Sequence, residues 1–267
     1  MSSHGECQIR IAALHEVRDI EKCVDLQGTV WGYSAGDLVP KRVFVVANAI
    51  GGQVIGAFDD QALAGFVLAL PGYRDGECYL HSHMLAVLPA YRNLSIGRRL
   101  KLAQRDDALR RGIKKIEWTF DPLEIKNAYF NIVRLGAVAR RYLPDHYGPS
   151  TSPLQGGLPT DRLVAEWWLD SPRVCDAVGR NVTGNPPVSS QNSGKAVERV
   201  TVPASVSEWK ANPEQRTLAL SLQTGVRLGL EKAFADGLAV TGYERGAEGD
   251  GSFVLRALSD EDLRPGI

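Results

Sequence analysis

Alternating and four-residue hydrophobic spacings divide the first part of the chain into short strands and helices. Alternation predicts a half-buried strand, whereas apolar residues three and four positions apart predict an amphipathic helix. The elements expected up to residue 87 are, in order, a strand at 7–14, a helix at 15–28, a helix from Pro40 to Ile50, a hairpin of strands 53–58 and 62–70 around Asp59-Asp60, a turn at 71–76, and a strand at 78–87. One strand, two helices and three further strands are therefore predicted, in that order.

The same spacing rules predict further helices and strands up to about residue 170. A tight turn at 92–97 leads into a helix with Ile96, Leu100 and Ala103 on one face, and Arg110-Arg111-Gly112 is a typical helix end. The later elements are a strand at 113–120, a helix at 123–135 that stops at Gly136, and a strand at 161–169.

Composition changes after Asp170. Residues 171–199 are rich in Ser, Pro, Gly and Asn, which predicts a linker or a long mobile loop. A short strand at 200–202, a helix at 213–235 and strands at 238–243 and 252–258 are expected beyond it.

The helix expected at 213–235 carries an apolar stripe. Its members recur every four residues: Leu218, Leu222, Val226 and Leu230. Such a stripe needs a partner surface, either on the rest of the chain or on a second subunit of a homodimer. The helix–Gly–strand–strand order of this part also describes 123–169, so we interpret it as a degenerate copy of that segment.

Charge and cysteine usage narrow the class of protein. Lys plus Arg and Asp plus Glu both number 31, giving zero formal charge. This balance argues against nucleic-acid binding, which depends on neutralising phosphates. No apolar run approaches a membrane span, and MSSHGECQIR lacks a signal peptide's apolar core. The four cysteines contain no CxxC pair, so a cytoplasmic protein with free thiols and no metal site is expected.

The turn at 92–97 carries the clearest chemistry. The first N–H groups of the following helix have no intrahelical partner, and the helix dipole adds positive charge there. Arg92, Arg98 and Arg99 lie beside those groups, Ser95 is expected to cap the helix, and Gly97 allows close approach of a ligand. The turn is either a seat for a phosphate or pyrophosphate, or a solvated basic helix start.

The amino-acid sequence of this turn resembles a known motif. Val87-x-Pro89-x-Tyr91-Arg92-x-x-Ser95-x-Gly97-Arg98 is similar to the acyl-CoA motif of the GNAT acyltransferase superfamily, Arg/Gln-x-x-Gly-x-Gly/Ala, with Ser95 in place of the first glycine. The resemblance implies an α/β GNAT fold with a mixed, mainly antiparallel sheet over residues 1–170, followed by the linker 171–199 and a smaller α+β extension at 200–267. It implies acetyl-CoA or another acyl-CoA as co-substrate and no metal. The cofactor-binding residues that it implies are Leu85, Ala86, Val87, Arg92, Asn93, Leu94, Ser95, Ile96, Gly97, Arg98 and Asn127.

The catalytic candidates lie on the strand before the turn. Strand alternation predicts Tyr79, His81, His83 and Leu85 on one face. His83 lies six residues before Pro89, where many GNAT members carry a glutamate base, and an imidazole can perform that role near neutral pH. His81 is a candidate relay. The alternative is that both histidines are structural.

The general acid is not assigned by the resemblance. Many members have a tyrosine four residues before the glycine that follows the next helix, and Ile132 occupies that position here. Asn131 and Tyr129 are the nearest polar substitutes, and Asn127 is a candidate for the pantetheine amide.

The acceptor side is less defined. Trp31 and Tyr33 either pack under their loop or line the substrate pocket, and Arg162 either holds an acceptor carboxylate or forms a surface ion pair with Asp161 or Glu166. The expected reaction is transfer of an acetyl or larger acyl group, such as succinyl, to a small-molecule amine such as an amino acid. The alternative is a degenerate GNAT protein that binds acyl-CoA as a sensor or scaffold.

Overall fold

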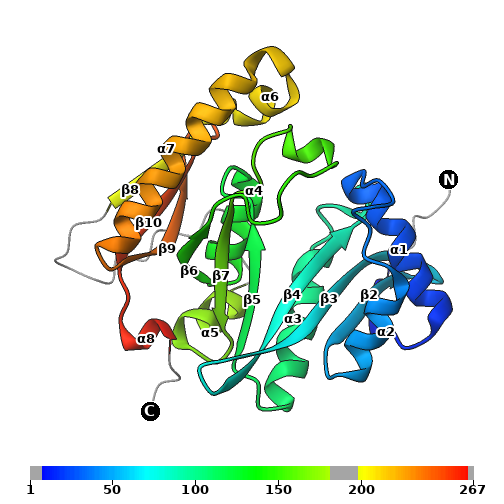
Figure 1. Ribbon diagram of the computed structural model, residues 1–267. Helices are drawn as coiled ribbons and strands as arrows, with labels where there is room; N and C mark the ends of the chain where they lie inside the picture. Colours follow the sequence, from blue (N-terminus) through cyan, green and yellow to red (C-terminus); the bar gives the residue numbers. More distant parts are fainter. Residues whose placement is uncertain (1–7, 181–197, 264–267) are drawn as a thin grey trace, which may run out of the picture. The chain divides into compact units, whose positions relative to one another are not determined.

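The computed structural model describes residues 8–180 and 198–263, and its contacts group the chain into two compact units, 1–116 and 117–267 (Figure 1). The second unit thus contains both residues 117–170 and the described part of the extension. The division into a domain over 1–170 and an extension over 200–267 stays a prediction.

The first unit is an antiparallel sheet with helices on both faces. Its elements are β1 (Arg10–Ala13), α1 (Val17–Trp31), α2 (Lys41–Ala49), β2 (Gln53–Asp59), β3 (Ala62–Arg74), β4 (Glu77–Val87), a 3-10 turn η1 (Pro89–Tyr91) and α3 (Ile96–Arg110). The strands follow the order β1-β2-β3-β4, and each neighbouring pair is antiparallel. Side chains of α1 and α2, including Ile20 and Phe44, form one apolar cluster with one face of the sheet. Ile96 and Leu100 of α3 belong to a second cluster that contains Val67.

The β3–β4 hairpin is longer than the sequence indicates. The turn predicted at 71–76 is wrong for its first residues, because Pro71 and Gly72 pair with Leu80 and Tyr79 as part of β3. A Cβ at Gly72 would come within 2.4 Å of the Tyr79 ring, so the strand passes this ring only with glycine. The reversal itself uses Asp75 and Gly76, both at positive φ.

Strand β4 contains a β-bulge at His83. Met84 pairs with Leu68 and Ser82 with Ala69, so His83 is the extra residue between two consecutive pairs. Cross-strand partners share a face of the sheet. The extra residue therefore shifts the side-chain alternation by one position.

This shift corrects the predicted face of β4. His81 pairs with Leu70, which packs against the α1–α2 cluster, whereas Leu85 packs against the cluster that includes α3. The expectation that Tyr79, His81, His83 and Leu85 share one face is therefore wrong. The physical reason is the inserted residue, which a period of two cannot reveal.

The second unit is also built on a sheet. Its elements are β5 (Lys115–Phe120, whose first residues belong to the first unit), α4 (Ile125–Tyr129), a π-helical turn η2 (Phe130–Arg134), β6 (Val138–Leu143), η3 (Pro153–Gln155), β7 (Arg162–Trp168), α5 (Pro172–Gly179), β8 (Glu198–Val202), α6 (Val206–Ala211), η4 (Pro213–Gln215), α7 (Arg216–Ala235), β9 (Leu238–Arg245), β10 (Gly251–Ala257) and α8 (Asp260–Leu263). The strand order is β5-β7-β6-β9-β10-β8. The pairs β6–β7, β6–β9, β9–β10 and β8–β10 are antiparallel, so the mainly antiparallel α/β class is confirmed.

The predicted linker at 171–199 is partly wrong. Helix α5 occupies 172–179, and β8 begins at Glu198. Ser171 accepts a hydrogen bond from the Val174 amide, and Pro172 stands in the first turn, so residues that look like linker composition are a helix start. Residues 181–197 lie outside the described part of the chain.

The apolar stripe of the long helix finds partners within the second unit. Helix α7 packs on β6, β8 and β9, and Val226 and Leu230 are buried. Leu218, at the first turn, is 51% exposed. The repeated helix–glycine–hairpin order is also present: Gly136 and Gly237 have φ of 77° and 78°, and β6 pairs with β9 through Ala139 and Val240.

Candidate active site

The turn between β4 and α3 is exposed and its backbone is unusual. Asn93 and Ser95 both have positive φ, at 71° and 58°, a conformation that glycine adopts more readily. Ser95 occupies the cap position of α3, but its side chain makes no capping hydrogen bond. A capping serine normally has extended φ/ψ, so the left-handed conformation explains why the expected cap is absent.

The turn fits an anionic ligand. The first hydrogen bond across the helix start runs from the Arg99 amide to the Ser95 carbonyl, so the amides of Ile96 and Gly97 precede it. A Cβ built on Gly97 would meet only the Leu85 side chain, at 3.7 Å, which leaves the backbone accessible. Arg92, Asn93, Leu94 and Ser95 are exposed around it.

The base of the turn is rigid. The Leu88 amide donates to the Ala64 carbonyl at 2.9 Å, and the Tyr91 hydroxyl donates to Asp59 at 2.9 Å. The Arg99 guanidinium donates to the Ile9 carbonyl. The turn is thus tied to β2 and β3, and the first turn of α3 is tied to the residue before β1, so the amides are held in place before any ligand binds.

The histidines of β4 lie close to one another. Their ring centroids are 6.1 Å apart, and the planes are tilted by 40°. His83 has an exposed side chain, yet desolvation by its surroundings lowers its pKa below the ordinary 6.5. The neutral imidazole therefore predominates at neutral pH, which is the form that accepts a proton.

The aromatic pair at the end of α1 belongs to the same side of the first unit as Met84. Trp31 is the last residue of α1, and its ring stacks on Tyr33 with centroids 5.6 Å apart and planes 21° apart. Both residues are half-buried and pack against the α1–α2 cluster, to which Met84 belongs. The structure thus supports packing of the pair, and its exposed portions leave a role in substrate binding as a prediction.

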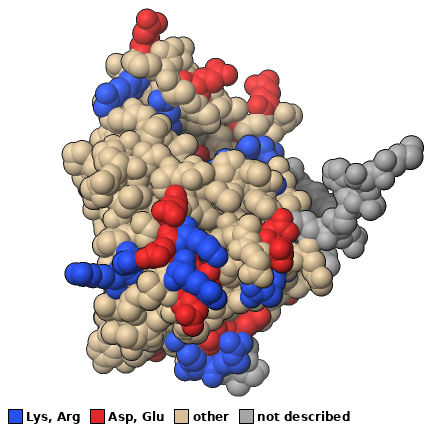
Figure 2. Space-filling model, turned by 90° about the vertical axis from the view of Figure 1, so that its right-hand side faces the viewer, with Lys and Arg blue, Asp and Glu red and all other residues tan. Residues whose placement is uncertain are grey.

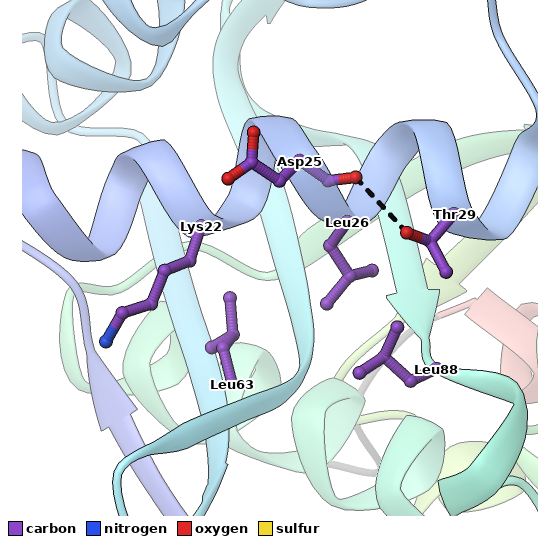
Figure 3. A pocket seen from close by; sticks show the side chains of 6 residues that line it. All are labelled: Lys22, Asp25, Leu26, Thr29, Leu63 and Leu88. Carbon is purple, nitrogen blue, oxygen red and sulfur yellow. Dashed lines mark hydrogen bonds between the residues drawn. The ribbon is translucent and has the colours of Figure 1, made fainter.

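A cavity that the sequence did not indicate adjoins the turn. It has a volume of about 250 Å³ and is lined by Lys22, Asp25, Leu26, Thr29, Leu63 and Leu88 (Figure 3). Leu88 immediately precedes η1, and the other residues come from α1 and the start of β3. Figure 3 shows the Asp25 carboxylate pointing away from the three leucines, while the Lys22 side chain extends past Leu63 on their side of α1. Its residues are scattered in the sequence, which leaves no motif to find.

The remaining catalytic candidates lie in the second unit. Asn131 is buried in the π-helical turn, where it accepts a hydrogen bond from Trp118 Nε1 at 3.2 Å and donates to Asn127 Oδ1 at 3.3 Å. Asn127 is exposed, Tyr129 is half-buried, and Ile132 is buried. The expected helix at 123–135 thus ends in a wider turn, a feature frequent at functional sites.

Arg162 is held by neutral partners. Its guanidinium donates to the Asp161 carbonyl and to Gln155 Oε1, at 2.8 and 3.1 Å, and lies 5.5 Å from the Tyr147 ring centroid. Glu166 instead pairs with Arg140 and Arg141. Arg162 is therefore oriented by its surroundings, and its use for an acceptor carboxylate stays a prediction.

The surface shows no concentration of one charge on the face in view. Blue and red side chains are interspersed there (Figure 2). None of the helices in 8–180 and 198–263 combines the length and apolar character needed to cross a membrane. Over the same residues, no three His, Cys, Asp or Glu side chains come together in a group that could hold a metal ion.

Part of the chain matches the sequence profile of a known protein family. Residues 25–130 match the profile of the Acetyltransferase (GNAT) family. This match includes the second half of α1, the whole sheet of the first unit except β1, the turn and α3. A search of curated proteins returned no match.

Solved structures resemble the chain at low sequence identity. A protein assigned as an acetyltransferase from Acinetobacter baylyi is 15% identical with a TM-score of 0.50, and the alignment covers 64% of this chain and 97% of that one. A protein with the same assignment from Salmonella typhimurium, solved with its cofactor acetyl-CoA, is 14% identical with a TM-score of 0.49, covering 61% and 94%. The ribosomal-protein-S18-alanine N-acetyltransferase of Escherichia coli is 16% identical with a TM-score of 0.48, covering 60% and 92%. At this identity the likeness to the Acinetobacter protein shows the fold alone.

Proposed function

Residues 25–130 belong to the GNAT acetyltransferase family, and from that premise we propose that the protein transfers an acyl group from acyl-CoA to a small-molecule amine. The observation that carries the proposal is the exposed turn after β4, with amides at Ile96 and Gly97 that precede the first helical hydrogen bond. A pyrophosphate would be held there by backbone N–H groups, the helix dipole and Arg92. Acyl-CoA supplies the acyl group as a thioester.

His83 is the proposed general base. As a neutral imidazole it would remove a proton from the acceptor ammonium, directly or through water, and so produce the amine that attacks the thioester carbonyl. The carbon–sulfur bond of the thioester then breaks, and CoA leaves as the thiolate. The backbone amides at Leu85–Val87 are proposed to polarise that carbonyl. His81, whose ring lies next to that of His83, would pass the proton on.

The acceptor is proposed to be an amine that also carries a carboxylate, such as an amino acid. Arg162, already oriented by Gln155 and the Tyr147 ring, is the candidate for that carboxylate. Trp31 and Tyr33 are the candidate walls of the acceptor pocket.

A second function has one observation in its favour. Ile132, at the position where many family members have a tyrosine acid, is buried and apolar. A protein without an acid to protonate the leaving thiolate would bind acyl-CoA without turnover and act as a sensor or scaffold.

One experiment separates the two functions. The protein is incubated with acetyl-CoA or succinyl-CoA and a panel of amino acids, polyamines and peptides, while release of the CoA thiol is followed. Turnover that depends on one acceptor supports the transferase. Tight CoA binding by calorimetry with no thiol release from any acceptor supports the sensor, and absence of CoA binding rejects both.

A further inference from the structure

A buried polar cluster lies between β4 and α3 in the first unit. Lys101, Ser82 and Gln104 are 2%, 4% and 0% exposed. The Lys101 ammonium nitrogen lies 2.8 Å from Ser82 Oγ and 3.2 Å from Gln104 Oε1, and the Ser82 hydroxyl donates to the same Gln104 oxygen at 3.1 Å. The lysine is thus held in the interior by hydrogen bonds that include those to Ser82 and Gln104.

A lysine is a costly residue at such a position. Desolvation lowers the pKa of Lys101 well below its ordinary 10.5. An apolar side chain of similar length would fill the same volume without that desolvation cost, so packing alone does not account for the amine. Its partner Ser82 offers a reason.

Ser82 is the residue directly before the bulge. His83 has no cross-strand partner in the register of β3 and β4, so the orientation of its imidazole depends on the residues on either side. Met84, on one side, is held by the apolar α1–α2 cluster. Ser82, on the other side, is held by the hydrogen bond from Lys101.

The same lysine belongs to α3, the helix that follows the turn at 92–97. Lys101 stands four residues after Gly97, about one helical turn along α3. The bond between Lys101 and Ser82 therefore links the start of α3 to the backbone that carries His83. The other end of the cluster uses different atoms: Gln53 donates to the backbone carbonyl of Gln104 and to the Asp107 carboxylate, whereas Lys101 and Ser82 bond the side-chain oxygen of Gln104.

We propose that Lys101 is a positioning residue, which through Ser82 fixes the β4 bulge and so sets the orientation of the His83 imidazole relative to the start of α3. The inference rests on the proposed function in taking His83 as the base. Its structural content, the dependence of His83 on Lys101, can be measured without any reaction.

The test uses Lys101→Met, Ser82→Ala and the double variant in the full chain. NMR titration of the His83 ring is expected to show the same changed pKa and chemical shift in all three, because both residues act through one hydrogen bond. If wild type is active, kcat should fall by up to about 10²-fold with the Kd for CoA unchanged, since misplacement rather than binding is affected. Ser82→Thr, which keeps the hydroxyl, should restore the wild-type titration.

Gln53→Leu is the matched control. It removes hydrogen bonds from the far end of the cluster, so it should lower Tm and leave the His83 titration unchanged. A His83 titration identical to wild type in Lys101→Met and in Ser82→Ala, whatever the loss of Tm, would overturn the inference. If Lys101→Met does not fold, Ser82→Ala decides alone. Absence of acyl transfer by the wild type would reject the proposed function, and the NMR comparison would still decide this inference.

Discussion

At the scale of single residues, His83 is the most direct point at which to test the chemistry. His83→Ala should lower kcat/KM by about 10²–10⁴-fold, the range for loss of a general base, with little change in the Kd for CoA. Steady-state kinetics and calorimetry measure the two quantities. His15→Ala is a suitable control, because His15 is also an exposed histidine and lies before α1.

The pH dependence follows from the shift of the His83 pKa. Desolvation lowers this pKa below 6.5, and only the neutral imidazole accepts a proton. The rate should therefore rise with pH through an apparent pKa below 6.5 and remain high at neutral pH. His83→Ala should lose this limb. A variant that keeps both the wild-type rate and the wild-type limb would exclude His83 as the base.

Gly97 tests the cofactor site by size and charge. Gly97→Glu should abolish CoA binding, because the side chain would occupy the ligand's space and its carboxylate would repel a pyrophosphate. Gly97→Ala is the matched control: its Cβ would meet only Leu85, at 3.7 Å, so the fold tolerates it. Calorimetric titration with CoA distinguishes them, and wild-type affinity in the glutamate variant would show that the site lies elsewhere.

At the scale of elements, the sequence predicts helices and strands whose apolar residues recur at regular spacing, but it does not predict irregularities such as a β-bulge. The helices α1, α2 and α3 and the hairpin of β2 and β3 follow from apolar spacing and turn residues. The bulge at His83 does not, since an inserted residue leaves the apolar pattern of β4 looking like an ordinary alternation. Which side chains of β4 face each side of the sheet is determined instead by the register of β4 with β3.

The turn and the linker show two further limits of local patterns. Ser95 is a common capping residue, but its left-handed backbone prevents the cap, and only the path of the chain from η1 to α3 determines that. Ser171 and Pro172 look like linker composition, and they start α5 because Val174 is buried in the second unit. In each case the local sequence is compatible with two backbone conformations, and the tertiary structure determines which one is adopted.

The connection between β6 and β7 depends on one buried carboxylate. Asp161 accepts hydrogen bonds from the Tyr142 hydroxyl at 2.7 Å and from the Asp145 amide at 3.0 Å. Burial and this bond raise the pKa of the Tyr142 phenol, so it remains a donor at every physiological pH. Asp161→Ala should lower the free energy of unfolding by about 1–3 kcal/mol for each donor left unpaired.

Chemical denaturation measures that loss. Tyr142→Phe is the control, because it removes one donor and leaves the Asp145 amide bonded to Asp161, so its cost should be smaller. Equal stability of Asp161→Ala and wild type would mean that the connection between β6 and β7 is held by other contacts.

At the scale of the whole molecule, the C-terminal elements complete the sheet of the second unit. Strand β6 pairs with β7 on one side and with β9 on the other, through Ala139 and Val240. Helix α7 packs on β6 as well as on β8 and β9. Two helix–glycine–hairpin segments are thus joined by their first strands, and the later part of the α7 stripe, Val226 and Leu230, is buried within the chain.

Truncation after Asp170 tests whether the chain depends on this arrangement. The truncated protein would expose the hydrogen-bonding edge of β6 together with apolar side chains that α7 covers, and such edges pair with other chains. It should therefore be aggregation-prone, as measured by light scattering and size-exclusion chromatography. A chain ending at Leu263 is the control, since it keeps α7, β9 and β10. A soluble, monomeric truncation with full activity would show instead that the C-terminal elements are dispensable and that β6 is stable as an edge strand.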